Sequence, residues 1–528
     1  MKVLDYPSFF FFFALCAFPL LLTGQTAGTP DPDFGQGGEV VITDSSKTYY
    51  GGYTVLLPDG KMIVAGNEYG ANGQPSVIVL TRLLAAGTLD LSYGVNGQVR
   101  PTINNGFDGG INSIALTAND QIILAGNIVT DTSSAAFVTR LDANGELDMS
   151  FGQDGIVVFD IGDDEDDFFS ILIKADGNIL LGGLTYDSGN SGFYDFLLVQ
   201  LLPDGSSDPD FGTGGVATAD FANGLEGIIA LALQADGKIV AAGANAVSSY
   251  NMEIVRFQPN GSIDQSFGNN GVFIFGPGTR DEVAYDVAVQ DDQKIVFCGT
   301  SFQNGSTTGE ITLFRINPDG SFDATFGMDG KVFTDLGLLE FARALVLQPD
   351  GKILVGAEGT LLSANFEEGQ FWVLRYNTDG SLDTTFGDNG KVQSPLYGQF
   401  ASTTGLLLQP DGKIIHTGTA NNQLVLWRYL NDIMVNVQET LLTDFHLQCS
   451  PNPVAESTNI SWTLEQSAEV RGDLYNAQGR LVQTIIPPAF LPAGAQQQTI
   501  HFTHEIPAGT YFLVLQVGRQ RQVISLIK

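Results

Sequence analysis

Acidic side chains recur at a fixed distance from a repeated turn in this chain of 528 residues. The acidic residues at this position, or one residue before it, are Asp108, Asp166, Glu226, Glu282 and Glu340. Tyr49 and Ala401 stand at the same position in the first and last copies. Carboxylate oxygens suit a hard cation such as Ca²⁺, and like charges held together repel one another unless a cation lies among them. We therefore predict a Ca²⁺ site formed by these acids. A set of polar strand ends that face water is the alternative.

Other chemistry finds little support in the residue types. His416 is the only histidine among the repeats, so a Ser/His/Asp triad or a histidine-rich zinc site is not expected. Cys298 stands within an apolar strand pattern, where a packed thiol is expected rather than a nucleophile. Signatures of metal hydrolases and phosphate loops are absent from the sequence.

The elements that position the acids are predicted from the repeated turn itself. At 347–351 the sequence reads Leu-Gln-Pro-Asp-Gly, and apolar runs at 344–347 and 352–355 flank it. Proline presets φ, aspartate can bond its own backbone and glycine accepts a positive φ, so the pattern predicts a β-hairpin. A third apolar run at 371–376, a turn at 377–380 and a final segment at 382–392 complete one copy. Each copy therefore predicts four short antiparallel strands.

Seven copies follow one another at nearly constant spacing. The rigid Phe-Gly or Tyr-Gly element recurs at residues 34, 93, 151, 211, 267, 326 and 386, and the hairpin turn also recurs seven times. Strands that are apolar on both sides must bury both faces of each sheet, which radial packing in a closed ring achieves. We predict an all-β fold, with a seven-bladed β-propeller at residues 30–430. An open solenoid is the alternative.

The ends of the repeat region predict how the ring closes. Residues 33–42 match the fourth strand of a copy but have no first three strands before them, while the last copy, after residue 429, lacks a fourth strand. We expect residues 33–42 to complete the seventh blade. Residues 433–437 could compete for the same edge.

Ligand recognition is expected on one face of the ring. In a propeller the first strands line the central channel, so the acids should lie at one mouth of it, together with the long loops between second and third strands. Variable loops on a fixed scaffold commonly carry recognition. The aromatic residues that these loops offer for stacking on sugars or peptide side chains are Tyr69, Tyr186, Phe193, Tyr194 and Phe302. Chance placement of aromatics in loops is the alternative.

The N-terminal sequence indicates where the protein is located, and the net charge limits the kinds of partner it can have. Lys2 precedes an apolar run at 9–22, followed by small residues at 23–27, which predicts a signal peptide at 1–27. No other stretch is long and apolar enough to cross a membrane. The net charge of −35 disfavours nucleic acid as a partner. We expect a monomer.

The composition changes near residue 445. Residues 431–444 are a candidate linker, and residues 445–528 carry five basic and five acidic side chains, unlike the acidic repeats. Short strands at 458–464, 470–475 and 507–514 predict a small immunoglobulin-like β-sandwich.

Two resemblances follow from these motifs. Leu-Gln-Pro-Asp-Gly-Lys-Ile at 347–353, followed by Leu-Asp-x-Thr-Phe-Gly-x-x-Gly at 382–390, resembles the delta-60 repeats of bacterial secreted proteins. The resemblance implies a propeller-like domain without an established activity. Residues 445–528, with Pro-Asn-Pro at 451–453 and Pro-Ala-Gly-Thr-Tyr-Phe at 507–512, resemble the C-terminal sorting domain of type IX secretion. This resemblance implies handling by the type IX machinery and a secreted or outer-membrane surface location in a Gram-negative bacterium. A plain adhesion module is the alternative.

Two classes of function remain open from the sequence. The first is a binding module whose loop face recognises an extracellular glycan or protein. The second is an enzyme, either a glycan lyase or hydrolase or a lactonase-like metal hydrolase, that uses the channel carboxylates. The scarcity of histidine favours the binding module.

Overall fold

The computed structural model describes residues 27–527 apart from 45, 70–75, 104–108, 130–132, 163–164, 188–192, 222–224, 247–249, 277, 304–305, 307, 364–365, 398–399, 433–446, 451–456, 465–466, 477–480, 502–509 and 518–519. The predicted signal peptide up to residue 26, Asp108 and residues 433–437 lie outside the described residues. The regular structure in the described part consists of strands. Contacts divide the chain into two compact units, Met1–Ile433 and Met434–Lys528.

The described residues of the first unit form seven four-stranded antiparallel sheets, here called blades, and the predicted all-β fold is confirmed. Blade 1 contains β2 (Thr48–Leu56), β3 (Met62–Tyr69), β4 (Val77–Leu83) and β5 (Gln98–Val99). Blade 2 contains β6 (Gly109–Leu116), β7 (Ile122–Val129), β8 (Ser134–Leu141) and β9 (Ile156–Phe159). Blade 3 contains β10 (Asp166–Ile173), β11 (Ile179–Asp187), β12 (Phe193–Leu201) and β13 (Val216–Ala219). Blade 4 contains β14 (Leu225–Leu233), β15 (Ile239–Ala246), β16 (Tyr250–Phe257) and β17 (Val272–Phe275).

The remaining blades complete the order. Blade 5 contains β18 (Asp281–Val289), β19 (Ile295–Phe302), β20 (Gly309–Ile316) and β21 (Lys331–Thr334). Blade 6 contains β22 (Leu339–Leu347), β23 (Ile353–Ser363), β24 (Phe366–Tyr376) and β25 (Lys391–Gln393). Blade 7 contains β26 (Ala401–Leu408), β27 (Ile414–Ala420) and β28 (Gln423–Tyr429), and its fourth strand is β1 (Glu39–Ile42) from the beginning of the chain.

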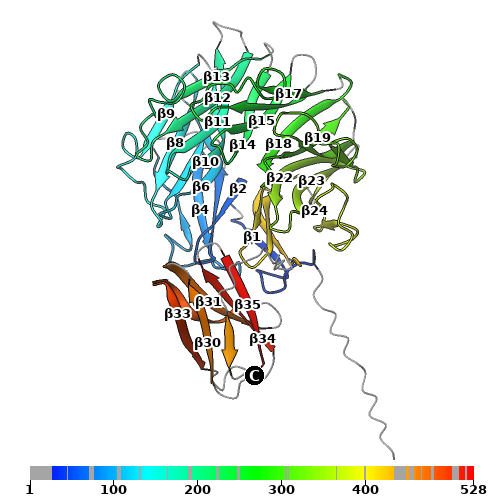
Figure 1. The fold of residues 1–528 in the computed structure, drawn as a ribbon. Coiled ribbons are helices and arrows are strands. Elements are labelled where there is room, and N and C mark those ends of the chain that lie inside the picture. Colours follow the sequence, from blue (N-terminus) through cyan, green and yellow to red (C-terminus); the bar gives the residue numbers. More distant parts are fainter. Residues whose placement is uncertain are drawn as a thin grey trace, which may run out of the picture. The chain divides into compact units, whose positions relative to one another are not determined.

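The blades close into a ring. Each first strand contacts the first strand of the next blade, and β2 of blade 1 contacts β26, β27 and β28 of blade 7. The first strands β6, β10, β14, β18 and β22 therefore lie towards the middle of the ring, while β9, β13 and β17 lie at its periphery (Figure 1). The apolar residues of neighbouring blades form shared cores. Ile123 and Ala125 of blade 2, for example, pack with Leu181 and Leu197 of blade 3.

The closing strand confirms the prediction made for residues 33–42. Glu39 to Ile42 pair antiparallel with Trp427 to Leu424 of β28. The preceding residues extend the pairing, because the Asp31 amide donates to the Arg428 carbonyl at 2.8 Å and the Gly28 amide donates to the Leu430 carbonyl at 2.7 Å. The first described residues thus complete the last blade.

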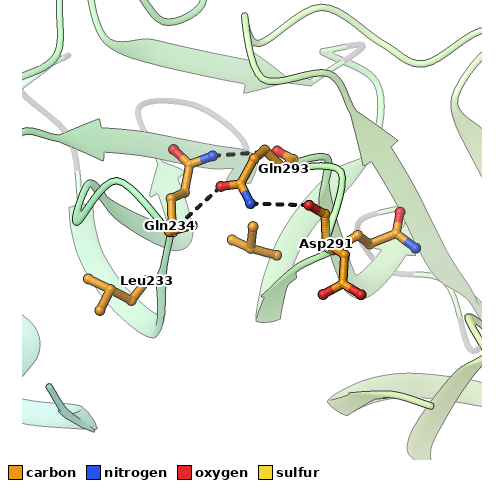
Figure 2. Close-up of a pocket in the computed structure, with 7 residues that line it drawn as sticks. Leu233, Gln234, Asp291 and Gln293 are labelled. Atoms are coloured by element: carbon orange, nitrogen blue, oxygen red, sulfur yellow. Dashed lines mark hydrogen bonds between the residues drawn. The ribbon is translucent and has the colours of Figure 1, made fainter. Parts of the chain in front are cut away.

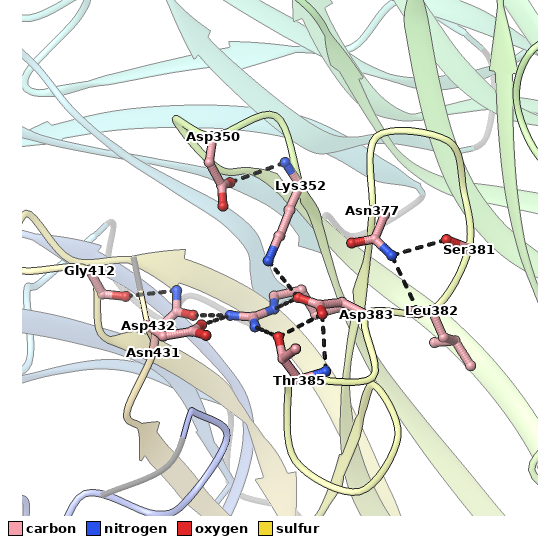
Figure 3. A network of polar contacts seen from close by, with 11 residues as sticks. Asp350, Lys352, Asn377, Ser381, Leu382, Asp383, Thr385, Gly412, Asn431 and Asp432 are labelled. Atoms are coloured by element: carbon pink, nitrogen blue, oxygen red, sulfur yellow. Dashed lines mark hydrogen bonds and ion pairs between the residues drawn. The ribbon is translucent and has the colours of Figure 1, made fainter. Parts of the chain in front are cut away.

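A buried ionic network explains why the repeat motifs keep a fixed phase. In blade 6, Arg375 Nε donates to Asp383 Oδ2 at 2.7 Å, and Lys352 Nζ, from the hairpin turn, reaches the same oxygen at 2.7 Å (Figure 3). The guanidinium of Arg375 lies over the ring of Phe386 at 4.6 Å, and Asp383 accepts from the Thr385 hydroxyl at 2.7 Å. Lysine, arginine, aspartate and phenylalanine of one copy therefore form one unit.

The same network recurs around the ring. The equivalent Arg–Asp pairs, with Nε to Oδ2 distances of 2.7–2.9 Å, are Arg82–Asp90, Arg140–Asp148, Arg256–Asp264, Arg315–Asp323 and Arg428–Asp31. In blade 3, Gln200 replaces the arginine and its amide donates to Asp208. Several of these arginines also donate to a turn carbonyl of the next blade, as Arg315 Nη1 does to Thr378 at 2.7 Å. The network therefore joins neighbouring blades as well as the strands within one blade.

Two hairpin turns lack the repeated glycine but keep its conformation. Asp120 has φ of 60° and Gln293 has φ of 66°, in the left-handed region that glycine occupies in the other turns. Both turns therefore keep the backbone conformation of the repeat, with strained non-glycine residues in place of glycine.

The second unit is a two-sheet β-sandwich, which agrees with the predicted fold. One sheet has the order β29 (Gln448–Ser450), β30 (Ser457–Leu464) and β33 (Gly494–His501). The other has the order β32 (Leu481–Leu491), β31 (Ala468–Asn476), β34 (Thr510–Val517) and β35 (Gln520–Ile527). Trp462, Leu474 and Leu513 belong to the core between them. Within the described residues, neither unit contains a helix long and apolar enough to cross a membrane.

Candidate functional site

The acids predicted at the starts of the first strands are buried. Asp166, Glu226, Glu282 and Glu340 are each at most 2% exposed. Three of them accept backbone N–H groups from the connection that leads into their own strand: Asp166 from Ile161 at 2.7 Å, Glu226 from Phe221 at 3.1 Å and Glu340 from Leu338 at 2.8 Å. Each of these carboxylates therefore holds the connection between two blades in place.

The structure does not gather these acids into one shared cluster. Among the described residues, no group of three or more His, Cys, Asp or Glu side chains is placed to hold a metal ion. Asp108 lies outside the described residues. Burial raises the pKa of Glu282 and of Glu340 to about 7, and one carboxylate oxygen of each has no hydrogen-bond partner among the described residues. The predicted Ca²⁺ site across the channel stays a prediction.

A ring of bulges marks the wall of the channel. Each first strand contains one extra residue at the same place, where its register with the second strand shifts. We call these seven residues the bulge ring: Gly52, Asn112, Phe169, Ile229, Tyr285, Arg343 and Thr404. Bulges commonly redirect a side chain next to a functional site. The residue at the bulge is of a different type in each of the seven blades. The bulge ring therefore does not follow the repeated sequence pattern.

One side of the bulge ring carries a cluster of aromatic and charged groups. Arg343 Nε donates to Glu358 Oε1 at 2.8 Å, and Glu358 is fully buried whereas the Arg343 side chain is 31% exposed. The guanidinium of Arg343 lies 4.3 Å from the ring centroid of Tyr285 and 5.0 Å from that of Phe341. The ring of Phe302 packs edge-on against Phe341 at 6.4 Å. We call these five residues the Arg343 cluster.

Blades 1, 2 and 3 contribute a second polar group at the channel. Asn112 of the bulge ring donates from Nδ2 to Asp167 Oδ1 at 2.8 Å. Burial raises the pKa of Asp167 to about 8, so this carboxyl group is mostly protonated at neutral pH. Burial, with a smaller contribution from the charge of Asp167, also raises the pKa of Tyr53 to about 12, and Arg343 opposes that rise. Groups from blades 1, 3 and 6 therefore influence one another across the channel.

The predicted aromatic residues fall into separate groups. Tyr69 packs edge-on against Tyr50 at 5.4 Å, and Tyr186 packs against Tyr194 at 5.2 Å. The Tyr194 hydroxyl donates to Glu165 at 2.6 Å. The side chain of Phe193 lies outside the described residues. Only Phe302 is brought into the Arg343 cluster.

Neither His416 nor Cys298 shows the surroundings of a catalytic group. Burial lowers the pKa of His416 to about 3, so its ring is neutral, and its Nε2 lies 3.1 Å from the Thr403 hydroxyl. Cys298 is fully buried, and burial raises the pKa of its thiol well above the usual value. Both side chains are packed in the core, as expected for Cys298.

The opposite face of the ring has a shallow pocket between two hairpin turns (Figure 2). The pocket is lined by residues of the blade 4 turn, such as Gln234, and of the blade 5 turn, such as Gln290 and Gln293. Gln293 joins the two turns, because its Oε1 accepts from the Ala235 amide at 3.2 Å. The side chain of Gln293 thus links the turns of blades 4 and 5.

Sequence reasoning missed Arg343, Tyr285, Phe341 and Glu358. One feature of the sequence could have pointed to Arg343, because the residue at this position differs in every copy of the repeat. The contact between Arg343 and Tyr285 of the neighbouring blade depends on the bulges, which the sequence pattern does not predict.

The fold and the channel define a β-propeller that is joined to a small β-sandwich. The repeats match the family described as "Domain of unknown function (DUF5122) beta-propeller" at residues 57–93, 117–151, 174–211, 234–267, 290–326 and 348–386. Residues 449–528 match the family described as "Secretion system C-terminal sorting domain". The chain is therefore a secreted or cell-surface protein built from DUF5122 propeller repeats and a type IX sorting domain.

The solved structures to which the chain shows similarity are distant in sequence. The polysaccharide lyase Uly1 is 10% identical over 72% of this chain and 90% of its own, with a TM-score of 0.40. A protein of unknown function from Dyadobacter fermentans is 10% identical over 76% of this chain and 100% of its own, with a TM-score of 0.36. A glucose dehydrogenase is 12% identical over 74% of this chain and 98% of its own, with a TM-score of 0.31. No curated protein matches the chain.

Proposed function

We propose that the propeller binds an extracellular glycan at the channel, with the Arg343 cluster as the contact surface. The observation that carries this proposal is the guanidinium of Arg343, which lies over the rings of both Tyr285 and Phe341, with 31% of its side chain exposed. Aromatic rings stack on the apolar faces of sugars, and guanidinium N–H groups bond to carboxylate or hydroxyl oxygens.

The cluster is built to keep its geometry before a ligand arrives. Glu358 fixes Arg343 from the buried side, and Glu358 also accepts from the Thr403 amide of blade 7 at 2.8 Å. Tyr285 comes from blade 5 and Phe341 from blade 6, so the surface spans the boundary between two blades. A preorganised surface loses less side-chain entropy on binding than a mobile one.

Binding of the purified protein to an array of neutral and acidic saccharides tests the proposal. We expect Phe341→Ala to weaken binding of any positive saccharide about tenfold, the order of magnitude of one aromatic or cation–π contact. The double variant Arg343→Met, Glu358→Gln removes the guanidinium without leaving a buried carboxylate unpaired. Tyr69→Ala, in a separate aromatic pair, is the matched control. Binding to no saccharide, or equal binding by all variants, would contradict the proposal.

The catalytic alternative has one specific candidate group. Asp167 is a buried carboxyl group beside the bulge ring, and its pKa of about 8 is suited to a general acid. If the propeller cleaves a bound glycan with this group, Asp167→Asn abolishes product release while binding persists. Chromatography of the glycans after incubation distinguishes cleavage from binding alone.

A further inference from the structure

Blade 4 carries two acids on one face of its sheet, and the second of them, Glu253, has no acidic counterpart in the neighbouring blades. Glu226 of β14 pairs directly with Asn245 of β15, and Glu253 of β16 pairs directly with Gly243 of β15. Gly243 and Asn245 are two residues apart on one strand, so Glu226, Asn245 and Glu253 share a face of the sheet. Because Gly243 has no side chain, nothing on β15 separates Glu253 from the other two residues.

These three groups are removed from solvent. Glu226 and Asn245 are each 2% exposed, and Glu253 is fully buried. Asn245 Nδ2 donates to Glu226 Oε1 at 3.0 Å. Both carboxylate oxygens of Glu253 lack a hydrogen-bond partner among the described residues. A buried carboxylate without a partner is strongly unfavourable, so Glu253 must either take up a proton or find a further group to neutralise its charge.

Blades 5 and 6 contain a hydrogen-bond donor at the position of Glu253. Thr312 and Trp372 stand three residues before Arg315 and Arg375, as Glu253 stands before Arg256. In each of those blades the acid at the start of the first strand has one unpartnered oxygen, and the Thr312 hydroxyl and the Trp372 N–H are also unpartnered. A water molecule can join such a donor to such an acceptor.

Blade 4 lacks such a neutral donor at this position. Glu253 replaces it with a second carboxyl group, and the negative charge of Glu226 raises the pKa of Glu253 further above the value that burial gives, while the Asn245 amide lowers it. A cation between the two carboxylates neutralises their charge, which a bridging water does not. Oxygen ligands in a buried site suit Ca²⁺ better than Mg²⁺, which keeps several waters.

We propose that blade 4 binds one Ca²⁺ between Glu226 and Glu253, with the amide oxygen of Asn245 as a third ligand. Two carboxylates balance the charge of the ion, and the oxygen and nitrogen of an asparagine amide exchange places by a simple flip. This site lies within one blade, and it requires neither Glu282 nor Glu340 from the set of acids predicted to meet across the channel.

Calcium binding to the chelator-treated full-length protein tests the site. We expect calorimetry to show one tight Ca²⁺ per chain, and metal analysis to recover it after desalting. Glu253→Thr copies the residue of blade 5, and Glu253→Gln keeps the shape of the side chain while removing its charge. Both variants should fold and lose the tight ion, with at least a tenfold loss of affinity.

A matched control separates this site from weak binding to an acidic surface. Glu340→Gln removes a carboxylate at the position of Glu226, but in blade 6, where Trp372 supplies the donor, and it should bind Ca²⁺ like the unaltered protein. Absence of tight Ca²⁺ from the unaltered protein overturns the proposal. Retention of the ion by both Glu253 variants, or tighter binding of Mg²⁺ than of Ca²⁺, also overturns it.

Discussion

Asp31 and Arg428 lie 397 residues apart in the chain and form a buried ion pair with Nε to Oδ2 at 2.8 Å. The guanidinium of Arg428 lies over the ring of Phe34 at 4.5 Å, and Lys413 Nζ reaches Asp31 at 3.0 Å. The first described segment thus supplies blade 7 with the aspartate and the aromatic residue that every other blade takes from its own fourth segment. The two ends of the ring are joined by the same contacts that recur within the blades.

Asp31→Ala should destabilise the propeller by about 3–5 kcal/mol, because it leaves Arg428 buried without its partner. Melting temperature and the denaturant midpoint check this. Asp33→Ala is the control, since Asp33 is exposed two residues away. Equal melting of the two variants would show that the pair does not hold the ring closed.

Residues Asn431 and Asp432 should stabilise the last blade boundary. Arg375, which is 1% exposed, donates to the side chains of both residues, at a place where other arginines of the network reach a turn carbonyl of the next blade. A chain ending at residue 433 should therefore melt above one ending at residue 430. The expected difference is about 1–3 kcal/mol, the cost of leaving buried donors unpaired. If the two chains melt alike, water replaces these contacts without loss.

The turn at Asp120 should become more stable with glycine. Asp120 holds φ of 60°, and Asp120→Gly relieves this strain at a position where the side chain has no contact that would be lost among those described. We expect a gain of about 0.5–1 kcal/mol in the free energy of unfolding. The reciprocal change, Gly177→Asp in blade 3, where φ is 87°, should destabilise. A loss of stability in Asp120→Gly would contradict this account.

Stability should fall as pH rises from 5 to 8. Burial raises the pKa of Asp167 and Glu253 to about 8 and of Asp286 to about 7, so folding favours their neutral forms. The stability from the neutral forms is fully present below about pH 4, the ordinary pKa of these groups, and is lost as pH rises through their folded values. Melting temperatures measured in metal-free buffer check the direction.

Asp167→Asn should flatten this pH dependence, because an amide keeps the hydrogen bond from Asn112 and does not titrate. Asp59→Asn, at a side chain that is 56% exposed, should leave the pH dependence unchanged.

The aspartates of the buried ionic network affect stability in a lower pH range. Hydrogen bonds and nearby cations outweigh burial and lower the pKa of Asp264 to about 2, so its stabilisation is present above about pH 4 and lost below it.

Much of the fold could be predicted from the sequence because each copy repeats its own turn chemistry. The glycine and proline of the hairpin turn fix local geometry, and the seven copies leave a surplus fourth strand at the start of the repeats and a missing one at their end. That mismatch alone predicted the closing strand β1, which pairs with β28. The spacing between Lys352, Arg375 and Asp383 also recurs from copy to copy. That recurrence could have predicted the buried ionic network.

The candidate site could not be predicted in the same way. The acids at the starts of the first strands can be recognised in the sequence. The orientation of their side chains depends on the connections between blades, which vary in length and composition. Arg343 meets Tyr285 because both are extra residues at bulges, and a bulge interrupts the alternation on which strand prediction rests. Contacts between blades bring together residues that are some sixty positions apart.

The closing strand has a consequence for how the molecule is made. Glu39 to Ile42 leave the ribosome long before β28 exists, so an apolar strand waits without its partner while almost four hundred residues are synthesised. At high concentration that strand can pair with β28 of a second molecule instead of its own. We therefore expect domain-swapped dimers among refolded molecules, and a disulfide engineered between β1 and β28 of one chain should suppress them.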